Sequence, residues 1–284
     1  MVVQHNLQAA NTNRMLGANV KAVSKSTEKL SSGYQVNRAA DDAAGLSISE
    51  KMRNQIRGIN QSVKNAEDGV SLIQTAEGNM SEIHSILQRM GELATKAAND
   101  VNASVDRKAI QDEIGELAKE IDSISTKAAF NGTKLLNGNF SGKQLQVGAN
   151  SGENMEISID AMSASVLFGA SGSTVAANTS TTGGTLNMFT HVAASEAMTL
   201  ISSAIKVVSA ARSLLGAKQN RLEYTIDNLE NYSENLTSAE SQIRDTDMAT
   251  EMTNYTKNNI LQQAAQSMLA QANQSTQGVL SLLQ

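Results

Sequence analysis

The longest regular pattern in the chain is found at residues 52–97, which read MRNQIRGINQSVKNAEDGVSLIQTAEGNMSEIHSILQRMGELATKA. Apolar side chains recur there in alternating steps of four and three, with one slip at Ala76, at positions Ile56, Ile59, Val63, Ala66, Val70, Ile73, Ala76, Met80, Ile83, Leu87, Met90, Ala94 and Ala97. This spacing is typical of a coiled-coil seam. At about 1.5 Å per residue the helix would be roughly 70 Å long, so it needs long partners.

Two other stretches carry matching apolar stripes. One is capped by Ser104, stopped by Asn131-Gly132, and places on one face Ile110, Ile114, Leu117, Ile121, Ile124 and Ala128. The other, from Ala197 to Ile243, keeps the four-three rhythm with polar interruptions at Lys218 and Thr225. Its length matches that of the first helix, so we expect a mainly α fold in which long antiparallel helices form a rod or coiled-coil bundle.

Composition supports thin helical layers. Only 3% of the 284 residues are aromatic, and tryptophan and proline are absent. Large rings supply much of the buried area of a thick core, and an interior proline would cost a helix about 3 kcal/mol. The chain therefore favours long, uninterrupted helices.

The middle of the chain has a different pattern. Leu145 and Val147, and then Met155, Ile157 and Ile159, alternate at period two across residues 148–152, which predicts a small β-hairpin at about residues 140–160. Residues 169–185 are nearly all Gly, Ala, Ser and Thr, so we expect a flexible surface loop there.

Both ends of the chain are amphipathic. The N-terminal stripe is Leu16, Val20, Val23, Thr27 and Leu30, and the C-terminal stripe is Ile260, Ala264, Met268 and Ala272. Neither has enough apolar area to be a stable helix alone in water. We expect residues 1–45 and 246–284 to pair as a separate helical core domain, residues 46–245 to form the rod, and neighbouring copies to cover the ends as a helical filament.

Several classes of function are disfavoured. The net charge of −5 and the lack of a Lys/Arg block give no case for nucleic-acid binding. The N-terminus has no secretory signal pattern, and no run approaches the length of a membrane span, so membrane insertion is not expected. His5, His84 and His191 have no metal-ligand spacing, and Asp41-Asp42 is interpreted as a helix cap without an accompanying base or nucleophile. We expect no cofactor, no metal and no enzymatic activity.

One segment is far more specific. Residues 30–46, LSSGYQVNRAADDAAGL, resemble the LSSG to DDAAGL motif of bacterial flagellins. Similar stretches follow at residues 65–71, 130–136, 271–274 and 279–283. The resemblance covers about residues 1–140 and 187–284.

This resemblance implies a secreted subunit of the extracellular flagellar filament, exported unfolded through the flagellar type III channel. Its implied partners are itself, the export machinery and a chaperone, the hook-junction and cap proteins, and a host Toll-like receptor. The terminal helices would line the filament core. The implied polymerisation residues are Leu16, Val20, Val23, Leu30, Ile260, Met268, Val279, Leu280, Leu282 and Leu283.

The resemblance also implies a receptor surface. The flagellin motif LQRxxELA falls at residues 87–94, and the recognition residues would be Gln88, Arg89, Glu92, Leu93 and, on the next helix, Glu113. Arg89 and Leu93 lie four residues apart on one helical face, as a charged fork and an apolar knob. The same face is also expected to pack against a neighbouring protofilament.

In a secreted filament the loop hydroxyls could accept O-linked sugars, at Ser171, Ser173, Thr179, Ser180, Thr181 and Thr182. Two other classes of protein fit part of the pattern. A soluble coiled-coil adaptor fits the heptads but does not explain residues 30–46, and a hook-filament junction protein resembles flagellin at both ends without building long filaments.

Overall fold

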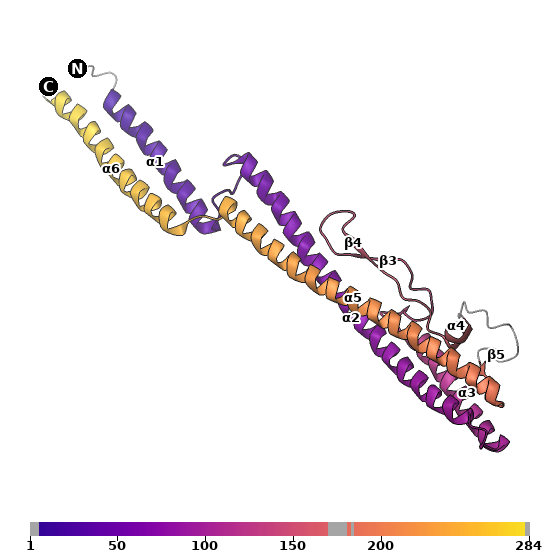
Figure 1. Cartoon of the computed structure of the whole chain (residues 1–284). Coiled ribbons are helices and arrows are strands. Elements are labelled where there is room, and N and C mark those ends of the chain that lie inside the picture. Colours follow the sequence, from indigo (N-terminus) through magenta and orange to yellow (C-terminus); the bar gives the residue numbers. More distant parts are fainter. Residues whose placement is uncertain (1–5, 170–180, 183–184, 282–284) are drawn as a thin grey trace. The chain divides into compact units, whose positions relative to one another are not determined.

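The computed structural model describes residues 6–169, 181–182 and 185–281 (Figure 1). Its elements are mainly helical, as predicted: α1 Leu7–Ser32, α2 Ala43–Ala97, α3 Ser104–Lys127, β1 Ala129–Phe130, β2 Thr133–Lys134, β3 Lys143–Gln146, β4 Asn154–Ile157, α4 Ala164–Gly169, β5 Thr181–Thr182, β6 Thr185–Leu186, α5 His191–Arg244 and α6 Met248–Ser281.

The chain divides into two compact units, and each is described by itself. The terminal unit comprises Met1–Ile56 and Glu234–Gln284, and the central unit comprises Arg57–Ser233. The division falls inside α2 and α5 rather than at the ends of these helices. Within the terminal unit these ends of α2 and α5 are joined by ion pairs: Glu50 Oε1 lies 2.9 Å from Arg244 Nη1, and Arg53 Nε lies 3.6 Å from Glu240 Oε1.

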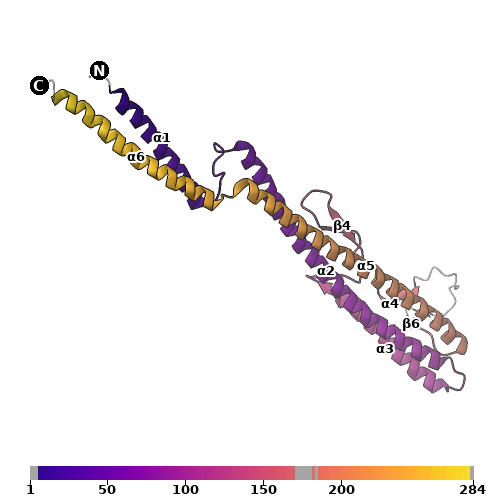
Figure 2. The same ribbon diagram turned by 60° about the vertical axis from the view of Figure 1, so that its left-hand side comes forward.

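In the central unit, α2, α3 and α5 enclose one apolar core, with α2 and α5 side by side in Figures 1 and 2. Apart from Leu93, the buried positions of α2 in this unit alternate in steps of three and four, at Ile59, Ser62, Ala66, Gly69, Ile73, Ala76, Met80, Ile83, Leu87, Met90, Ala94 and Ala97. The coiled-coil seam predicted for α2 is therefore confirmed from Ile73 onward.

The first half of this seam differs from the prediction. Val63 and Val70 are only half-buried, and the seam passes through their neighbours Ser62 and Gly69. The Ser62 hydroxyl donates to the Gly58 carbonyl at 2.9 Å, so its burial leaves no polar group unpaired. In the sequence, the apolar residues nearest to these two seam positions are the valines one position later. Counting the valines instead of Ser62 and Gly69 produces the apparent slip at Ala76.

Gly69 is buried because the β-hairpin lies against it. A Cβ at this position would overlap Leu145 Cδ2 and lie 3.3 Å from Leu222 Cδ1 of α5. About three turns earlier in α2, a Cβ at Gly58 would lie 2.9 Å from Ala149 Cβ at the hairpin tip. Small residues on α2 thus allow the hairpin backbone to approach the helix closely.

The hairpin predicted at residues 140–160 is confirmed. Strands β3 and β4 pair antiparallel, with Leu145 opposite Met155 and Lys143 opposite Ile157. A second short pair, β1 with β2, turns through Asn131 and Gly132, which both have positive φ. The predicted stop at Asn131-Gly132 is therefore this turn, a few residues beyond the end of α3 at Lys127.

Two predicted boundaries need correction. Ser104 is the first residue of α3 rather than its cap; Ala103 holds the cap position, and its N–H donates to the Asp106 carboxylate at 3.3 Å. The predicted loop at residues 169–185 also begins and ends differently: Gly169 closes α4, and β5 pairs with β6 through Thr182 opposite Thr185. Threonine favours strands although it is not a large apolar residue. A lack of large apolar side chains therefore does not exclude a short strand pair here.

One helix of the described residues passes a simple test for a membrane span. An 18-residue window of α5 has a mean hydropathy of 1.3, and only 22% of it is buried. The α5 residues that enter the core of the central unit are Ala194, Ala197, Ile201, Ala204, Val208, Leu215 and Leu222. These residues have the predicted coiled-coil spacing. Part of the apolar character of α5 is therefore explained by its packing against the other helices of the central unit.

Candidate assembly surface and receptor face

The terminal unit is built on the pairing of α1 with α6, which run side by side in Figures 1 and 2. Asn6 connects the two helices and caps the first: its side-chain amide donates to the Ala272 carbonyl at 3.1 Å, and its oxygen accepts from the Ala9 N–H at 3.0 Å. The residues of α1 that are buried or half-buried in heptad spacing are Ala9, Thr12, Leu16, Asn19, Val23, Ser26 and Leu30.

This seam separates the predicted N-terminal residues into two groups. Leu16, Val23 and Leu30 are half-buried in it, seven residues apart, whereas Val20 is exposed on another face of α1. The predicted stripe shares Leu16, Val23 and Leu30 with the seam but takes Val20 where the seam has Asn19, because Asn19 is polar and gives no apolar signal.

The C-terminal stripe is likewise not the seam of α6. The half-buried or buried residues follow the heptad of Tyr255, Asn258, Gln262, Ala265, Leu269 and Ala272. Of the predicted stripe only Ala272 belongs to this set. Ile260 is 60% exposed and Met268 is 59% exposed, with Ala264 exposed between them. The face of α6 toward α1 therefore mixes polar and apolar residues, whereas the stripe of Ile260, Ala264 and Met268 is apolar and exposed.

The remaining predicted polymerisation residues lie at the extreme C-terminus. Val279 and Leu280 belong to the last turns of α6, but their side chains are not among those described. Leu282 and Leu283 lie outside the described residues.

The segment with the most specific sequence motif connects α1 to α2 and is held by the link between α5 and α6. The Gln35 N–H donates to the Arg244 carbonyl at 2.7 Å, and the Thr246 N–H donates to the Gly33 carbonyl at 2.9 Å. The Arg244 guanidinium lies 4.7 Å from the centre of the Tyr34 ring, a cation–π distance. Gly33 has φ +76°, the left-handed conformation that ends α1.

Of the two acidic residues of this motif, Asp42 caps α2, as predicted, whereas Asp41 binds the turn that precedes it. Asp42 Oδ1 accepts from the N–H groups of Ala44 and Gly45 at 3.0 and 2.9 Å, at the start of α2. Asp41 accepts from the Arg38 N–H and pairs with Lys25 Nζ at 2.9 Å. The hydrogen bond from Lys25, together with that from Arg38, lowers the pKa of the Asp41 carboxyl below its ordinary value.

The predicted receptor residues meet on the surface of α2 and α3. Arg89 donates from Nε and Nη2 to Glu113 Oε1 at 3.2 and 3.0 Å, and from Nη1 to Glu92 Oε2 at 3.2 Å. These bonds, with Glu113 contributing most, raise the pKa of Arg89 above its ordinary value. Gln88 lies one turn from His84, with 3.1 Å between Gln88 Nε2 and His84 Nε2. The side chains of Arg89, Glu92 and Glu113 are all largely exposed.

Leu93 does not lie on this exposed face. Its side chain is 4% exposed and belongs to the core of the central unit, so the prediction of an apolar knob beside Arg89 is wrong. With two partner helices on α2, the buried arc of that helix is wider than one seam, and it includes Leu93 next to Ala94.

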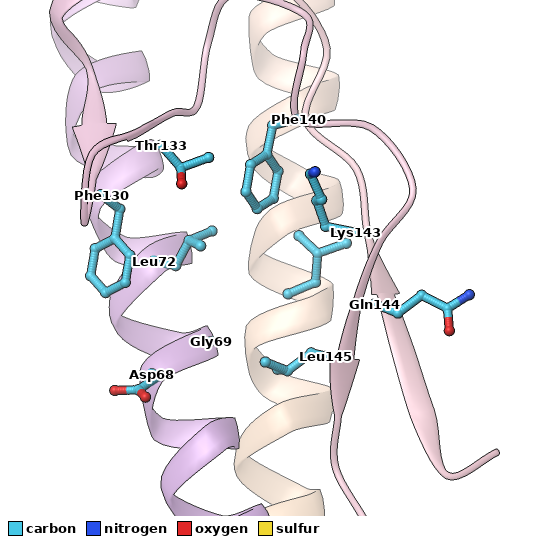
Figure 3. A pocket seen from close by; sticks show the side chains of 10 residues that line it. Asp68, Gly69, Leu72, Phe130, Thr133, Phe140, Lys143, Gln144 and Leu145 are labelled. Carbon is cyan, nitrogen blue, oxygen red and sulfur yellow. The ribbon is translucent and has the colours of Figure 1, made fainter. Parts of the chain in front are cut away.

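The central unit also contains a pocket of about 350 Å³ between α2, β1–β2 and the hairpin (Figure 3). Rings and aliphatic chains form most of its wall, and Asp68 and Lys143 are its charged lining residues. Neither a cysteine nor a histidine is among the lining residues, and Thr133 has no paired base there. Within the described ranges no group of three or more His, Cys, Asp or Glu could hold a metal ion.

The sequence is similar to known proteins over both its N-terminal and its C-terminal parts. Residues 3–141 match the bacterial flagellin N-terminal helical region, and residues 198–283 match the bacterial flagellin C-terminal helical region. The chain belongs to the bacterial flagellin family. A flagellin of Halalkalibacterium halodurans is 51% identical over 283 residues, covering 100% of both chains. A flagellin of Bacillus subtilis is 48% identical over 303 aligned positions, again covering 100% of both.

Flagellins are structural, non-enzymatic proteins that polymerise into the extracellular filament of the bacterial flagellum and so serve motility. Full-length identity to flagellins disfavours the adaptor and the junction protein. A solved structure described as a flagellar hook-associated protein from Vibrio parahaemolyticus has a TM-score of 0.57, covering 72% of this chain and 100% of that chain. Its identity is 13%, so this similarity concerns the fold alone.

Proposed function

We propose that this subunit enters the flagellar filament through the outward faces of α1 and α6. The observation that carries the proposal is the exposed apolar stripe of α6, at Ile260, Ala264 and Met268, on the side away from its pairing with α1. Contiguous exposed apolar surface is typical of an interaction site. A second copy of the chain is the occupant that the flagellin family indicates.

Energetics agree with this role. Burying one large aliphatic side chain contributes about 1.5–3 kcal/mol. Val20 on α1 and Ile260, Leu261 and Met268 on α6 are still partly exposed in the single chain, so each has part of this contribution left to gain. Contacts between ends that do not close a ring repeat as a helix, which is the geometry of a filament.

The test is seeded growth of filaments from purified subunits, followed by sedimentation and negative-stain microscopy. Ile260→Asp places a charge in the outward stripe and is expected to abolish growth. Ile260→Leu, which keeps the apolar volume at the same position, is the matched control and should grow normally. Deletion of residues 250–284 should also abolish growth while the central unit stays helical. Normal growth of Ile260→Asp would contradict the proposed surface.

A second proposal concerns the exposed network of Arg89, Glu92 and Glu113, with Gln88 beside it. We propose that this face packs against a neighbouring protofilament and is read by the host Toll-like receptor for flagellin when the subunit is free. Two elements supply the charges, and Arg89 holds them in one arrangement through three hydrogen bonds. A planar, preorganised guanidinium with neighbouring carboxylates is suited to specific protein recognition.

Arg89→Ala tests this face in a cell reporter for the receptor, applied as monomer. We expect the concentration for half-maximal response to rise about ten-fold or more, the loss of one interface hot spot. Lys119→Ala is the matched control, because Lys119 forms a similarly exposed pair with Glu116 on α3, at 2.7 Å. Equal responses of the two variants would refute receptor contact at Arg89, and sedimentation of each variant reports separately on filament packing.

The other partners of the subunit remain part of the proposal. The export machinery and a chaperone would handle the chain before assembly, when the outward faces of α1 and α6 are uncovered. The hook-junction and cap proteins would contact the same faces at the two ends of the filament. A chaperone that binds these faces should protect Ile260 and Met268 but leave the central unit unchanged in hydrogen exchange.

O-linked sugars on the serine and threonine residues of 171–182 are proposed last. Ser171, Ser173, Thr179 and Ser180 lie outside the described residues, whereas Thr181 and Thr182 form β5. An intact mass of the secreted protein equal to its sequence mass would refute the modification.

A further inference from the structure

The methionines of the chain are distributed unevenly. There are twelve, and all but Met1 are among the described residues. Those that are buried all lie in the central unit: Met80, Met90, Met155, Met162 and Met188. Those that are exposed all lie on the terminal helices: Met15, Met248, Met252 and Met268. Met52 and Met198 are half-buried.

The four exposed side chains have almost the same accessibility, with 54% for Met15, 49% for Met248, 50% for Met252 and 59% for Met268. Met248 and Met252 are one helical turn apart in α6, and Met268 belongs to its outward stripe with Ile260. The four thioethers are therefore open to solvent on α1 and α6, and that of Met268 lies within the stripe that is proposed to bind other copies.

Thioethers are also the dominant oxidisable groups of this protein. The sequence contains no cysteine and no tryptophan. Peroxides oxidise methionine to the sulfoxide, which changes a flexible apolar side chain into a polar one. Susceptibility follows exposure, so oxidation should be concentrated in the terminal unit and should leave the core of the central unit intact.

We propose that Met15, Met248, Met252 and Met268 form a hydroperoxide-sensitive modification site that controls assembly. In the free subunit their oxidation replaces apolar contacts with sulfoxide dipoles, and polymerisation stops. In the filament the same side chains are covered by neighbouring copies and are protected. The proposal rests on the proposed polymerisation through α1 and α6.

The chemistry is balanced with hydrogen peroxide as oxidant. The sulfur lone pair attacks one peroxide oxygen, an S–O bond forms as the O–O bond breaks, and the sulfur loses two electrons. The departing hydroxide takes the proton left on the transferred oxygen, which gives methionine sulfoxide and water. In the reverse direction, methionine sulfoxide reductases return the thioether while a dithiol becomes a disulfide and the oxygen leaves as water.

The experiment begins with free subunit treated with limiting hydrogen peroxide and analysed by peptide mass spectrometry. The four exposed methionines are expected to gain oxygen about ten-fold faster than Met80, Met90, Met162 and Met188, because susceptibility follows exposure. The partly oxidised pool is then grown on seeds. Sulfoxides at the four positions should be enriched in the unpolymerised fraction, and reductase with dithiothreitol should restore growth. Preformed filaments given the same peroxide should gain little oxygen at these positions.

Variants give a second readout. Met15→Leu, Met248→Leu, Met252→Leu and Met268→Leu, combined in one chain, should make growth resistant to peroxide. A chain with Met52→Leu and Met198→Leu is the matched control and should lose growth on oxidation as the natural chain does. If the quadruple variant does not grow at all, the natural chain provides the test. The proposal then requires that sulfoxides at the four positions are enriched in the supernatant relative to the pellet.

Three results would overturn the proposal. Oxidised subunit could grow as well as untreated subunit, sulfoxides at the four positions could be distributed equally between the fractions, or the quadruple variant could lose growth on oxidation. Untreated subunit runs in parallel throughout. If it fails to grow on seeds, the proposed polymerisation fails as well; if it grows while any of the three results is found, the failure concerns oxidation alone.

Discussion

The central and terminal units use the same helical spacing but bury very different side chains. The seam of α2 in the central unit contains Ile73, Met80, Ile83, Leu87 and Met90, all fully buried. In the seam of α1, small or polar residues are interspersed with the larger apolar ones: Ala9, Thr12, Leu16, Asn19, Val23, Ser26 and Leu30. Apart from Val36 and Ala272, every buried apolar residue of the described chain belongs to the central unit.

The difference shows that heptad spacing predicts which helices pair, whereas side-chain size and the number of partners determine how stable the pair is. α2 has both α3 and α5 around it in the central unit, so its side chains are covered on a wide arc. Among the described helices α1 packs mainly against α6, and apolar residues on the outward sides of both are exposed in the single chain. A subunit that is exported and then assembled can use such a division between a stable part and a part completed by its neighbours.

The largest effect is expected from a core truncation in the central unit. Leu87→Ala should lower the free energy of unfolding by about 2–5 kcal/mol, because Leu87 is fully buried and would leave a cavity. Leu16→Ala in the half-buried seam of α1 should lower it by less than about 1 kcal/mol. Urea denaturation of the free subunit, monitored by circular dichroism, measures both. Similar losses for the two variants would break the comparison between the units.

A glycine pair tests the close packing of the hairpin. Gly69→Ala should destabilise the central unit by about 1–3 kcal/mol, since the new methyl group overlaps Leu145. Gly115→Ala is the control: nothing lies within 4 Å of its new Cβ, and the gain in helix propensity should stabilise α3 by up to about 1 kcal/mol. Thermal unfolding of the two variants should shift in opposite directions. Equal shifts would show that the hairpin can move away from α2.

The parts of the fold that could be predicted from the sequence are those marked by a repeating apolar pattern. Long helices, their pairing and the hairpin were predictable, because apolar residues repeat at helical or strand spacing over many turns. The seam through Ser62 and Gly69 was not, since neither residue is a large apolar one, and Gly69 is covered by the hairpin, which contacts α2 from a distant part of the sequence. A search that treated small residues as permitted seam positions would have found unbroken spacing.

The candidate site was predicted less well than the fold. The sequence motif located Arg89, Glu92 and Glu113, but burial of Leu93 depends on the position of α3, which a single helix pattern does not contain. In the terminal unit Val20 and Ile260, which were predicted to act in polymerisation, lie outside the seam between α1 and α6, and both are exposed. The seam of α6 could not be recognised from apolar spacing alone, because Asn258 and Gln262 in it are polar.

A smaller effect is expected at the link that holds the motif segment of the terminal unit. Tyr34→Ala removes the ring under Arg244 and should cost about 0.5–1 kcal/mol locally. The Gln35 N–H, which donates to Arg244, should then exchange with solvent about two- to five-fold faster in a hydrogen-exchange experiment on free subunit. Tyr224→Ala is the control, because Tyr224 is exposed on α5 in the central unit. No change at Gln35 in Tyr34→Ala would show that the backbone bonds alone hold the segment.

The smallest effect is expected from the Lys25–Asp41 pair, and its sign follows from linkage. The pKa of Asp41 is lower in the folded terminal unit than in the unfolded chain, where it is about 3.9. Its stabilising contribution is therefore present above about pH 4 and is lost as the pH falls through the lowered folded value.

Carbon NMR of the Asp41 carboxyl should place its titration below that of the unfolded chain. Lys25→Met should bring the titration back toward the ordinary value, because the hydrogen bond from Lys25 is the main cause of the shift. An unchanged titration in Lys25→Met would mean that the backbone donor at Arg38 dominates instead. In that case acid would weaken the turn itself rather than its connection to α1.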